Sequence, residues 1–127
     1  MVVKGLLYTQ DHEWAKVEGD IATVGVTHYA QDQLGELTFV ELPVVGRVYP
    51  FHKELGVVES SKAASDVYSP VAGQVTEVNH ELQSKPELIN QDCYGAGWIC
   101  KMKITDKASL KTLMDSKQYE QYLKGLS

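Results

Sequence analysis

The chain repeats itself at an offset of 27 residues, on either side of Lys62. Residues 40–55 and 67–82 are identical at seven of sixteen positions, whereas unrelated segments of that length share about one. The two blocks are centred on position 61. The centre of a two-fold repeat is expected at the tip of a hairpin on the symmetry axis, so we predict that Lys62 is exposed and within reach of another protein. The identical residues are Val40, Pro43, Val44, Gly46, Val48, Glu54 and Leu55, which recur as Val67, Pro70, Val71, Gly73, Val75, Glu81 and Leu82.

The length of the chain predicts a single domain, residues 1–127, with one hydrophobic core. Lys and Arg number 12 against 17 Asp and Glu, a net charge of −5. This balance argues against a nucleic-acid binder, which needs a basic face, and favours docking onto basic patches of partner proteins. We expect a monomer.

Neither a membrane span nor a targeting segment is expected. The chain has no apolar run of about 18 residues, and its first residues match neither a signal peptide nor a transit peptide. The expected location is therefore the cytoplasm, or the mitochondrial matrix if the chain is the processed form of an imported protein. The two cysteines form no C-x-x-C and predict no metal site. Cys100 shares a strand face with Trp98, Met102 and Ile104 and is expected in the core, and Cys93 is expected to be a free thiol in a loop.

Short strands dominate the predicted secondary structure, with small helices at the end of the chain. This pattern favours a β-rich sandwich or barrel with helical decoration over a doubly wound α/β fold. A short helix is expected at 28–34, between an N-cap at Thr27 and a stop at Gly35. Two terminal helices are expected, capped by Thr105 or Asp106 and by Ser116. The expected strands are 13–17, 21–26, 37–42, 56–59, 67–69 and 71–78, the last with a bend or bulge at Gly73, and 79–90 is expected to form short helical turns.

The residues around Lys62 favour an accessible amine. An unmodified surface lysine is otherwise an ordinary hydrated cation. Small side chains next to the lysine leave it uncovered for the active site of an enzyme, and two acids give a partner a charge pattern to read. The small residues are Ser60, Ser61, Ala63 and Ala64, and the acids are Glu59 and Asp66.

The sequence resembles the glycine cleavage system H protein family from Leu7 to the terminal helices. Several separate motifs occur in the same order as in the family, and the most specific of them surrounds Lys62. The motifs are Asp11-His12-Glu13-Trp14, Val24-Gly25-Val26-Thr27, Ala30-Gln31, Leu34-Gly35-Glu36, Phe39-Val40-Glu41-Leu42-Pro43 with Gly46, Gly56-Val57-Val58-Glu59-Ser60, Lys62-Ala63-Ala64-Ser65-Asp66, Tyr68-Ser69-Pro70, Val78-Asn79, Leu88-Ile89-Asn90, Tyr94-Gly95 and Gly97-Trp98.

This resemblance implies a fold and a cofactor. The fold is the barrel-sandwich hybrid of lipoyl domains, mainly β with two quasi-two-fold-related halves, with a core at about residues 8–104 and a C-terminal helical extension at about 106–124. Lys62 is implied to carry lipoic acid in a covalent amide. Glu59, three residues before Lys62, and Gly73, eleven after it, are implied in recognition by the lipoate-attaching enzyme. A bend residue is the structural alternative for Gly73.

The resemblance further implies a non-catalytic shuttle protein with three enzyme partners. The lipoyl arm accepts an aminomethyl group from glycine decarboxylase, a PLP enzyme, and delivers it to aminomethyltransferase, which uses tetrahydrofolate. Dihydrolipoyl dehydrogenase, an FAD enzyme, then reoxidises the arm. Tethering makes each delivery nearly intramolecular, at effective concentrations of up to about mM.

Carboxylates near the lysine are candidates for holding the cationic cargo through charge-assisted contacts. Glu13 and Asp66 match family positions associated with a cleft that shields the loaded arm, with Asp11 nearby in sequence. The alternative is that each is an ordinary exposed acid. His12 is expected to be structural or cleft-lining rather than catalytic. The remaining histidines, His28, His52 and His80, are expected at the surface.

Three other functions compete with the lipoylated shuttle. A biotinyl carrier is disfavoured because its acceptor lysine usually lies between methionines, whereas Ser61 and Ala63 flank Lys62. An H-like protein that acts mainly as a lipoate donor or adaptor keeps Lys62 and remains open. An enzyme with its own active site lacks a nucleophile–base pair, a metal cluster or a cofactor loop in the sequence. The chain departs from the family at Ser61, where Val is common, at Cys93, where proline is common, and at His52-Lys53, where a glycine before an acid is common and a different turn is expected.

Overall fold

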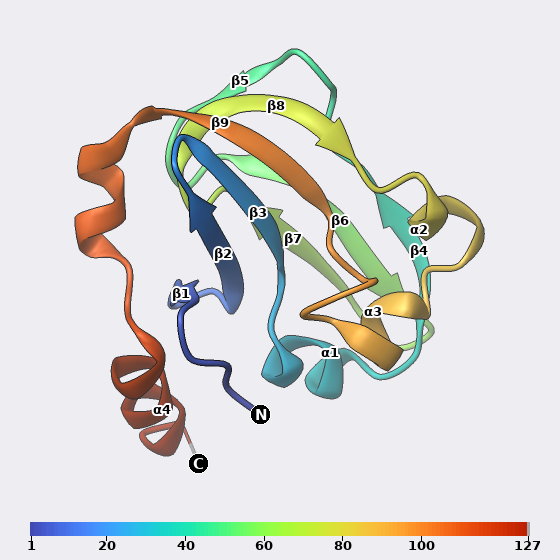
Figure 1. The fold of residues 1–127 in the computed structure, drawn as a ribbon. Coiled ribbons are helices and arrows are strands. Elements are labelled where there is room, and N and C mark those ends of the chain that lie inside the picture. The colour runs from blue at the N-terminus through green and yellow to red at the C-terminus, as the bar shows by residue number, and fades with distance from the viewer. Residues whose placement is uncertain (127) are drawn as a thin grey trace.

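A computed structural model describes residues 1–126 of the chain and arranges them as two β-sheets with short helices around their edges (Figure 1). The larger sheet has the strand order β1-β2-β3-β9-β8-β5 and the smaller one β4-β6-β7, and every pairing is antiparallel. This mainly-β architecture confirms the expected barrel-sandwich hybrid. The strands are β1 Leu7–Tyr8, β2 Glu13–Glu18, β3 Ile21–Val26, β4 Leu37–Glu41, β5 Val48–Tyr49, β6 Glu54–Ser60, β7 Ala64–Tyr68, β8 Ala72–Val78 and β9 Cys100–Asp106.

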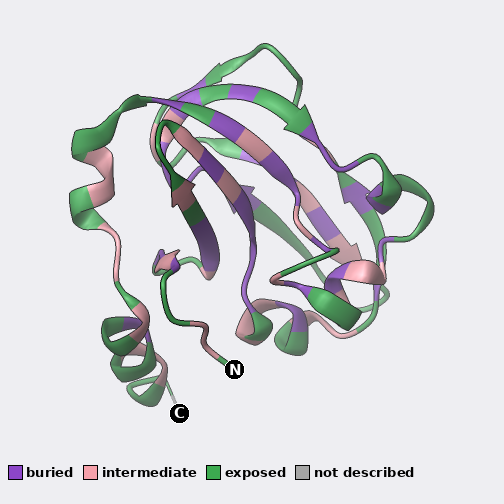
Figure 2. Cartoon of the chain, in the orientation of Figure 1, coloured by how far each residue is buried: buried purple, intermediate pink, exposed green. Residues whose placement is uncertain are grey.

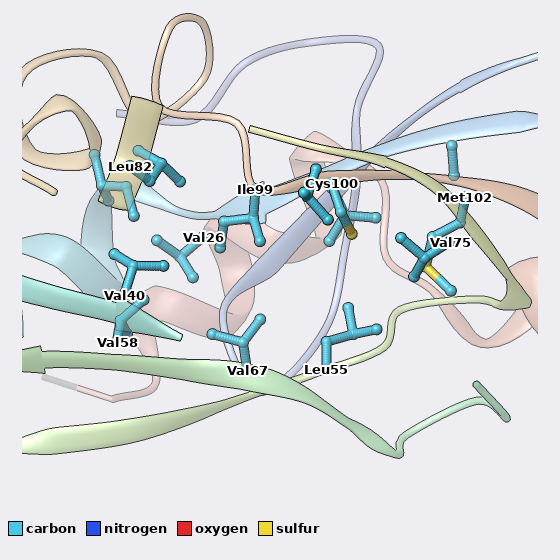
Figure 3. Close-up of a cluster of buried hydrophobic side chains, with 14 of the residues drawn as sticks. Val26, Val40, Leu55, Val58, Val67, Val75, Leu82, Ile99, Cys100 and Met102 are labelled. Atoms are coloured by element: carbon cyan, nitrogen blue, oxygen red, sulfur yellow. The ribbon is translucent and has the colours of Figure 1, made fainter. Parts of the chain in front are cut away.

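The main core fills the space between the two sheets (Figure 3). Buried and more exposed residues alternate along β8 and β9 (Figure 2), as expected for strands with one face against a core. Cys100 is fully buried, which confirms its prediction as a core residue. Cys93 is a free thiol in the turn after residue 92, as expected, and it is buried there; its carbonyl accepts the indole N–H of Trp14 at 3.0 Å. The indole carries a donor that needs a partner once buried, and position 93 supplies it.

Matching residues of the internal repeat have similar burial only where both copies face the core. Val40 and Val67, like Leu55 and Leu82, are buried in equivalent positions. Val48 is 59% exposed whereas its counterpart Val75 is 1% exposed. The difference follows from the sheet order, because β8 lies between β9 and β5 whereas β5 is a two-residue edge strand. The apolar pattern of the first copy therefore overstates its burial.

The helices occupy the expected places, with one corrected boundary. The helix α1, His28–Leu34, begins at the Thr27 side chain, which accepts the N–H of Ala30 at 3.3 Å, and ends at Gly35 with φ of 79°. Asp106 caps the 3₁₀ helix η1, Lys107–Thr112. The last helix, α4 Ser116–Lys124, is capped by Asp115 and not by Ser116 as predicted, because the Asp115 carboxylate and the Gln118 side chain form a reciprocal capping box. The short helical turns expected over 79–90 are present as α2 Glu81–Ser84 and α3 Leu88–Asp92, and the second runs two residues past the expected end.

The C-terminal helix is fastened to the sheets by an aromatic cluster. The ring of Tyr119, fully buried, stacks on Tyr8 at a centroid distance of 4.5 Å. Its hydroxyl lies 2.7 Å from His12 Nδ1 and 2.8 Å from Thr27 Oγ1. His12 is thus a structural residue, as expected, and it links the loop before β2 to α4 and the start of α1.

Candidate functional site

Lys62 lies at the turn of the β6–β7 hairpin, exposed, as the repeat predicted. The turn is closed by the N–H of Ser60, which donates to the Ala63 carbonyl at 2.8 Å. The Ser60 hydroxyl oxygen also accepts the backbone N–H groups of Lys62 and Ala63, at 3.4 and 3.3 Å. Short polar side chains that bond to nearby backbone groups stabilise turns. Ser60 therefore fixes the backbone of the turn and leaves the lysine side chain free.

The Lys62 side chain passes over the end of α1. A methyl group placed on Gly35 would have the Lys62 Cε at 3.9 Å as its only neighbour within 4 Å. Asn90, on α3, holds this end of α1 in place, because its side-chain amide donates to the Gly35 carbonyl at 2.8 Å and accepts the N–H of Leu37 at 2.8 Å. The lysine therefore lies beside a fixed segment of backbone, and no ion pair joins it to the described part of the chain.

Glu59 and Asp66 project from the two strands of the hairpin, on the side away from the core. Glu59 pairs with Ala64, and Asp66 pairs with Val57. Because Val58 and Val67 point into the core, their neighbours Glu59 and Asp66 point outward by the alternation of a strand. The structure therefore brings Lys62, Glu59 and Asp66 together on one hairpin.

Glu13 is buried at the opposite end of β7 from the turn. Its carboxylate is 1% exposed, accepts the Thr9 hydroxyl at 2.6 Å, and accepts the backbone N–H of Tyr68 at 3.2 Å. Burial raises the pKa of Glu13 from 4.5 to about 7, although its two hydrogen-bond donors favour the charged form. Glu13 therefore joins the larger sheet to the edge strand of the smaller one, and it is not the freely exposed acid that was the alternative.

Carboxylates gather around the phenol of Tyr68. The Asp66 carboxylate is the main cause of a raised pKa of Tyr68, and Glu54, Asp11 and Glu13 act in the same direction. Asp11 also lies 3.5 Å from His52. An open hollow of about 500 Å³ lies here, lined by Tyr49, Pro50, His52, Lys53, Glu54 and Tyr68. We call the hollow and these four carboxylates the Tyr68 recess; the carboxylates outnumber Lys53, the lysine in its lining.

Gly73 lies apart from the hairpin, in the larger sheet. A methyl group on Gly73 would come within 2.5 Å of the Lys103 carbonyl oxygen, and the β8–β9 register shifts between Ala72 and Gly73. Both facts confirm the expected bend or bulge, where β8 approaches the backbone of β9 too closely for a side chain. A role for Gly73 in recognition by an attaching enzyme remains a prediction.

The sequence reasoning missed Tyr68, Gly35 and Gly56 as residues that shape the site. Gly56 is required because a methyl group there would overlap the Glu41 carbonyl oxygen on the neighbouring strand. The glycine within a strand pattern was a signal for such a close approach. Tyr68 had no comparable signal, because its acidic surroundings come from three separate segments, around residues 11–13, 54 and 66. At His52-Lys53, where the family commonly has a glycine before an acid, His52 adopts φ of 69°. This is a left-handed backbone conformation that glycine adopts at little cost.

Two antiparallel sheets with an exposed lysine at a hairpin turn define the lipoyl-carrier class of fold. Within residues 1–126, no three His, Cys, Asp or Glu side chains are placed to hold a metal ion. No helix in that range is long and apolar enough to cross a membrane.

Comparisons with known proteins narrow this class to one family. A family model described as Glycine cleavage H-protein matches residues 6–126. Glycine cleavage system H proteins of Symbiobacterium thermophilum and Bradyrhizobium diazoefficiens are 52% and 54% identical to the chain, over 94% and 90% of its length and 93% of theirs. A crystal structure of a glycine cleavage system H protein from Mycobacterium marinum, 35% identical, has a TM-score of 0.89 and covers 97% of this chain and 99% of its own. The chain belongs to the glycine cleavage H-protein family.

Proposed function

We propose that Lys62 carries lipoic acid in amide linkage and that the chain is a carrier of the glycine cleavage system. The observation that carries the proposal is the exposed Lys62 at the turn of the β6–β7 hairpin, in a chain of the H-protein family. The neighbours Ser61 and Ala63 are exposed and small, so an enzyme can approach the amine from several directions.

The residues present fit the attached group. Acylation removes the charge of the lysine, and the described structure loses no ion pair when it does so. The lipoyl group supplies a pair of sulfur atoms for group transfer and redox chemistry, and the protein supplies its position. Ser60 and Gly35 provide that position, because one fixes the turn and the other leaves room for the stem of the arm.

The proposed role is to carry the aminomethyl group from glycine decarboxylase to aminomethyltransferase, and reducing equivalents to dihydrolipoyl dehydrogenase. The chain itself is not catalytic in this scheme. Attachment to one protein makes each encounter nearly intramolecular. The cytoplasm, or the mitochondrial matrix for an imported form, is the proposed location.

The Tyr68 recess is proposed to receive the cationic cargo. Asp66 is exposed and lies on the strand that follows the lysine, so it is placed for direct contact with an ammonium group. Glu13 has both carboxylate oxygens in hydrogen bonds. Its part is to hold the edge of β7 against β2 and to add negative field, and Glu13→Ala is expected to speed the loss of ammonia from the loaded form.

Intact-mass measurement of the protein from its native cells tests the proposal. One lipoyl adduct is expected on the wild type and none on Lys62→Arg, and a wild-type mass without the adduct would refute lipoylation. The purified lipoylated protein is expected to support glycine–bicarbonate exchange by glycine decarboxylase. Lipoylation without exchange would favour the lipoate donor or adaptor instead.

A further inference from the structure

The small sheet carries a second exposed feature beside the hairpin, on the face that points away from the core. Phe39, on β4, is 50% exposed. Phenyl rings are usually buried, either in the core of the protein or in an interface with a partner. Phe39 pairs with Glu59, and Glu59 pairs with Ala64. Phe39 therefore lies in the same cross-strand row as Ala64 on β7, the strand that follows the lysine, with β6 between them.

A second row runs beside the first. Glu41 pairs with Val57, and Val57 pairs with Asp66. All members of the two rows alternate with core residues and so share the outer face. We call this set the β4–β6–β7 face; it consists of Phe39, Glu41, Val57, Glu59, Ala64 and Asp66.

The β4–β6–β7 face is acidic around its phenyl ring. It contains three carboxylates and no basic residue, and none of the three forms an ion pair within residues 1–126. Exposed acids of one sign attract a basic partner and steer its approach. The face therefore suits a protein surface with basic groups around an apolar pocket.

A hollow of about 440 Å³ adjoins the phenyl ring on the side of α2. Its lining includes Phe39, Leu42, Pro43, Val45, His80 and Gln83. Figure 1 shows β4 running next to α2 at this edge of the small sheet. An apolar side chain of a partner would find a recess here, next to a ring that can enter a pocket of the partner.

We propose that the β4–β6–β7 face is the docking surface for the lipoate-attaching enzyme, with Phe39 as its anchor. The proposal rests on the proposed function, because it assumes that Lys62 is acylated. An enzyme that acts on the lysine nitrogen must place its active site on the hairpin itself. Its footprint, about 800 Å² on each partner for an ordinary interface, then covers the adjoining strands. The three shuttle partners act on the sulfurs at the far end of the arm, so their chemistry does not require contact with the lysine nitrogen at the hairpin turn.

Lipoylation kinetics of the unmodified protein test the anchor. Phe39→Ala is expected to raise the KM of the attaching enzyme for its protein substrate by about tenfold, as truncation of an aromatic interface residue does, with little change in kcat. Val44→Ala is the matched control, because Val44 is 51% exposed and lies outside the face. Denaturant unfolding of both variants separates a docking defect from a folding defect.

Charge reversal supplies a second measurement that does not depend on the ring. Glu41→Lys is expected to lower kcat/KM for lipoylation about tenfold at low ionic strength, and added salt is expected to shrink the loss. Glu77→Lys is the control, because Glu77 is also exposed but lies on β8 in the larger sheet.

The outcomes distinguish this proposal from the one on which it rests. Equal kinetics for Phe39→Ala and Val44→Ala, with wild type acylated normally, would overturn the docking face and leave lipoylation intact. A lipoylated Phe39→Ala protein should still support glycine–bicarbonate exchange at the wild-type rate. Loss of exchange with normal lipoylation would assign the face to glycine decarboxylase and also overturn the proposal. Failure of the wild type to accept lipoate on Lys62 would defeat the carrier function first.

Discussion

Glu13→Gln is expected to make the protein more stable at neutral pH and to leave it nearly unchanged at acid pH. Glu13 is 1% exposed, and burial raises the pKa of its carboxyl from 4.5 to about 7. Glutamine resembles the protonated acid in shape and in having both a donor and an acceptor. It can therefore keep a hydrogen bond to Thr9 or to the N–H of Tyr68 without the cost of a buried charge.

The magnitude follows from the pKa difference between the folded and unfolded chain. Each pKa step is worth about 1.4 kcal/mol, so a rise from 4.5 to about 7 costs the ionised folded state about 3 kcal/mol. Because burial raises the pKa in the folded state, the protonated Glu13 avoids this cost, and the stability that it contributes is fully present below pH 4.5. It is lost as the pH rises from 4.5 through about 7, where the unfolded chain has released the proton that the folded chain retains.

Denaturant unfolding between pH 4.5 and pH 8 measures this effect. The free energy of unfolding of the wild type should fall relative to that of Glu13→Gln by about 3 kcal/mol across this range. Glu36→Gln, which removes an exposed carboxylate, controls for the change in net charge and should run parallel to the wild type. A constant difference between wild type and Glu13→Gln at every pH would refute the claim that burial raises the pKa of Glu13.

Three further substitutions test the framework around the lysine. Gly56→Ala should destabilise the protein by about 2 kcal/mol or more in thermal or denaturant unfolding, because the new methyl group overlaps the Glu41 carbonyl; an unchanged midpoint would contradict this close approach. Asn90→Ala should cost about 2 kcal/mol, since it leaves backbone groups at the end of α1 without partners, and faster amide exchange at Leu37 would locate the loss. Tyr119→Phe should cost about 1 kcal/mol by removing the hydroxyl between His12 and Thr27, so a stability equal to wild type would show that these hydrogen bonds do not contribute to holding α4.

Local patterns in the sequence predicted the helices, most of the strands and the position of the lysine, but they missed the two-residue strands β1 and β5 and placed β7 at 67–69 instead of Ala64–Tyr68. The helix at 28–34 was predictable because its cap, its length and its stop are all encoded within nine residues, Thr27 to Gly35. The hairpin was predictable because the repeat is centred on it, and the antiparallel β6–β7 pairing has its turn at 61–63. The cap of α4 was misplaced by one residue, since Asp115 and Ser116 are both good capping residues and only the reach of Gln118 decides between them.

Features that depend on distant pairing could not be predicted in the same way. The apolar repeat residue Val44 is 51% exposed although its counterpart Val71 is fully buried, because burial depends on which strands lie beside each copy. Glu13 is a charged residue whose burial depends on meeting the edge of β7, 55 positions away in the chain. The Tyr68 recess likewise collects acids from three segments, and no short sequence window contains them all.

The arrangement around Lys62 combines a fixed backbone with a free side chain, and each property has its own cause. The backbone is fixed because Ser60 closes the turn and Gly56 lets β6 approach β4 closely. The side chain is free because its neighbours are small and Gly35 has no side chain to obstruct it. A mobile hairpin would present the amine in many orientations and reduce the fraction of encounters that lead to acylation. Substitutions of Gly56 that weaken the packing of β6 against β4 should therefore slow the attachment of lipoate at Lys62, even though they leave the lysine and its neighbours unchanged.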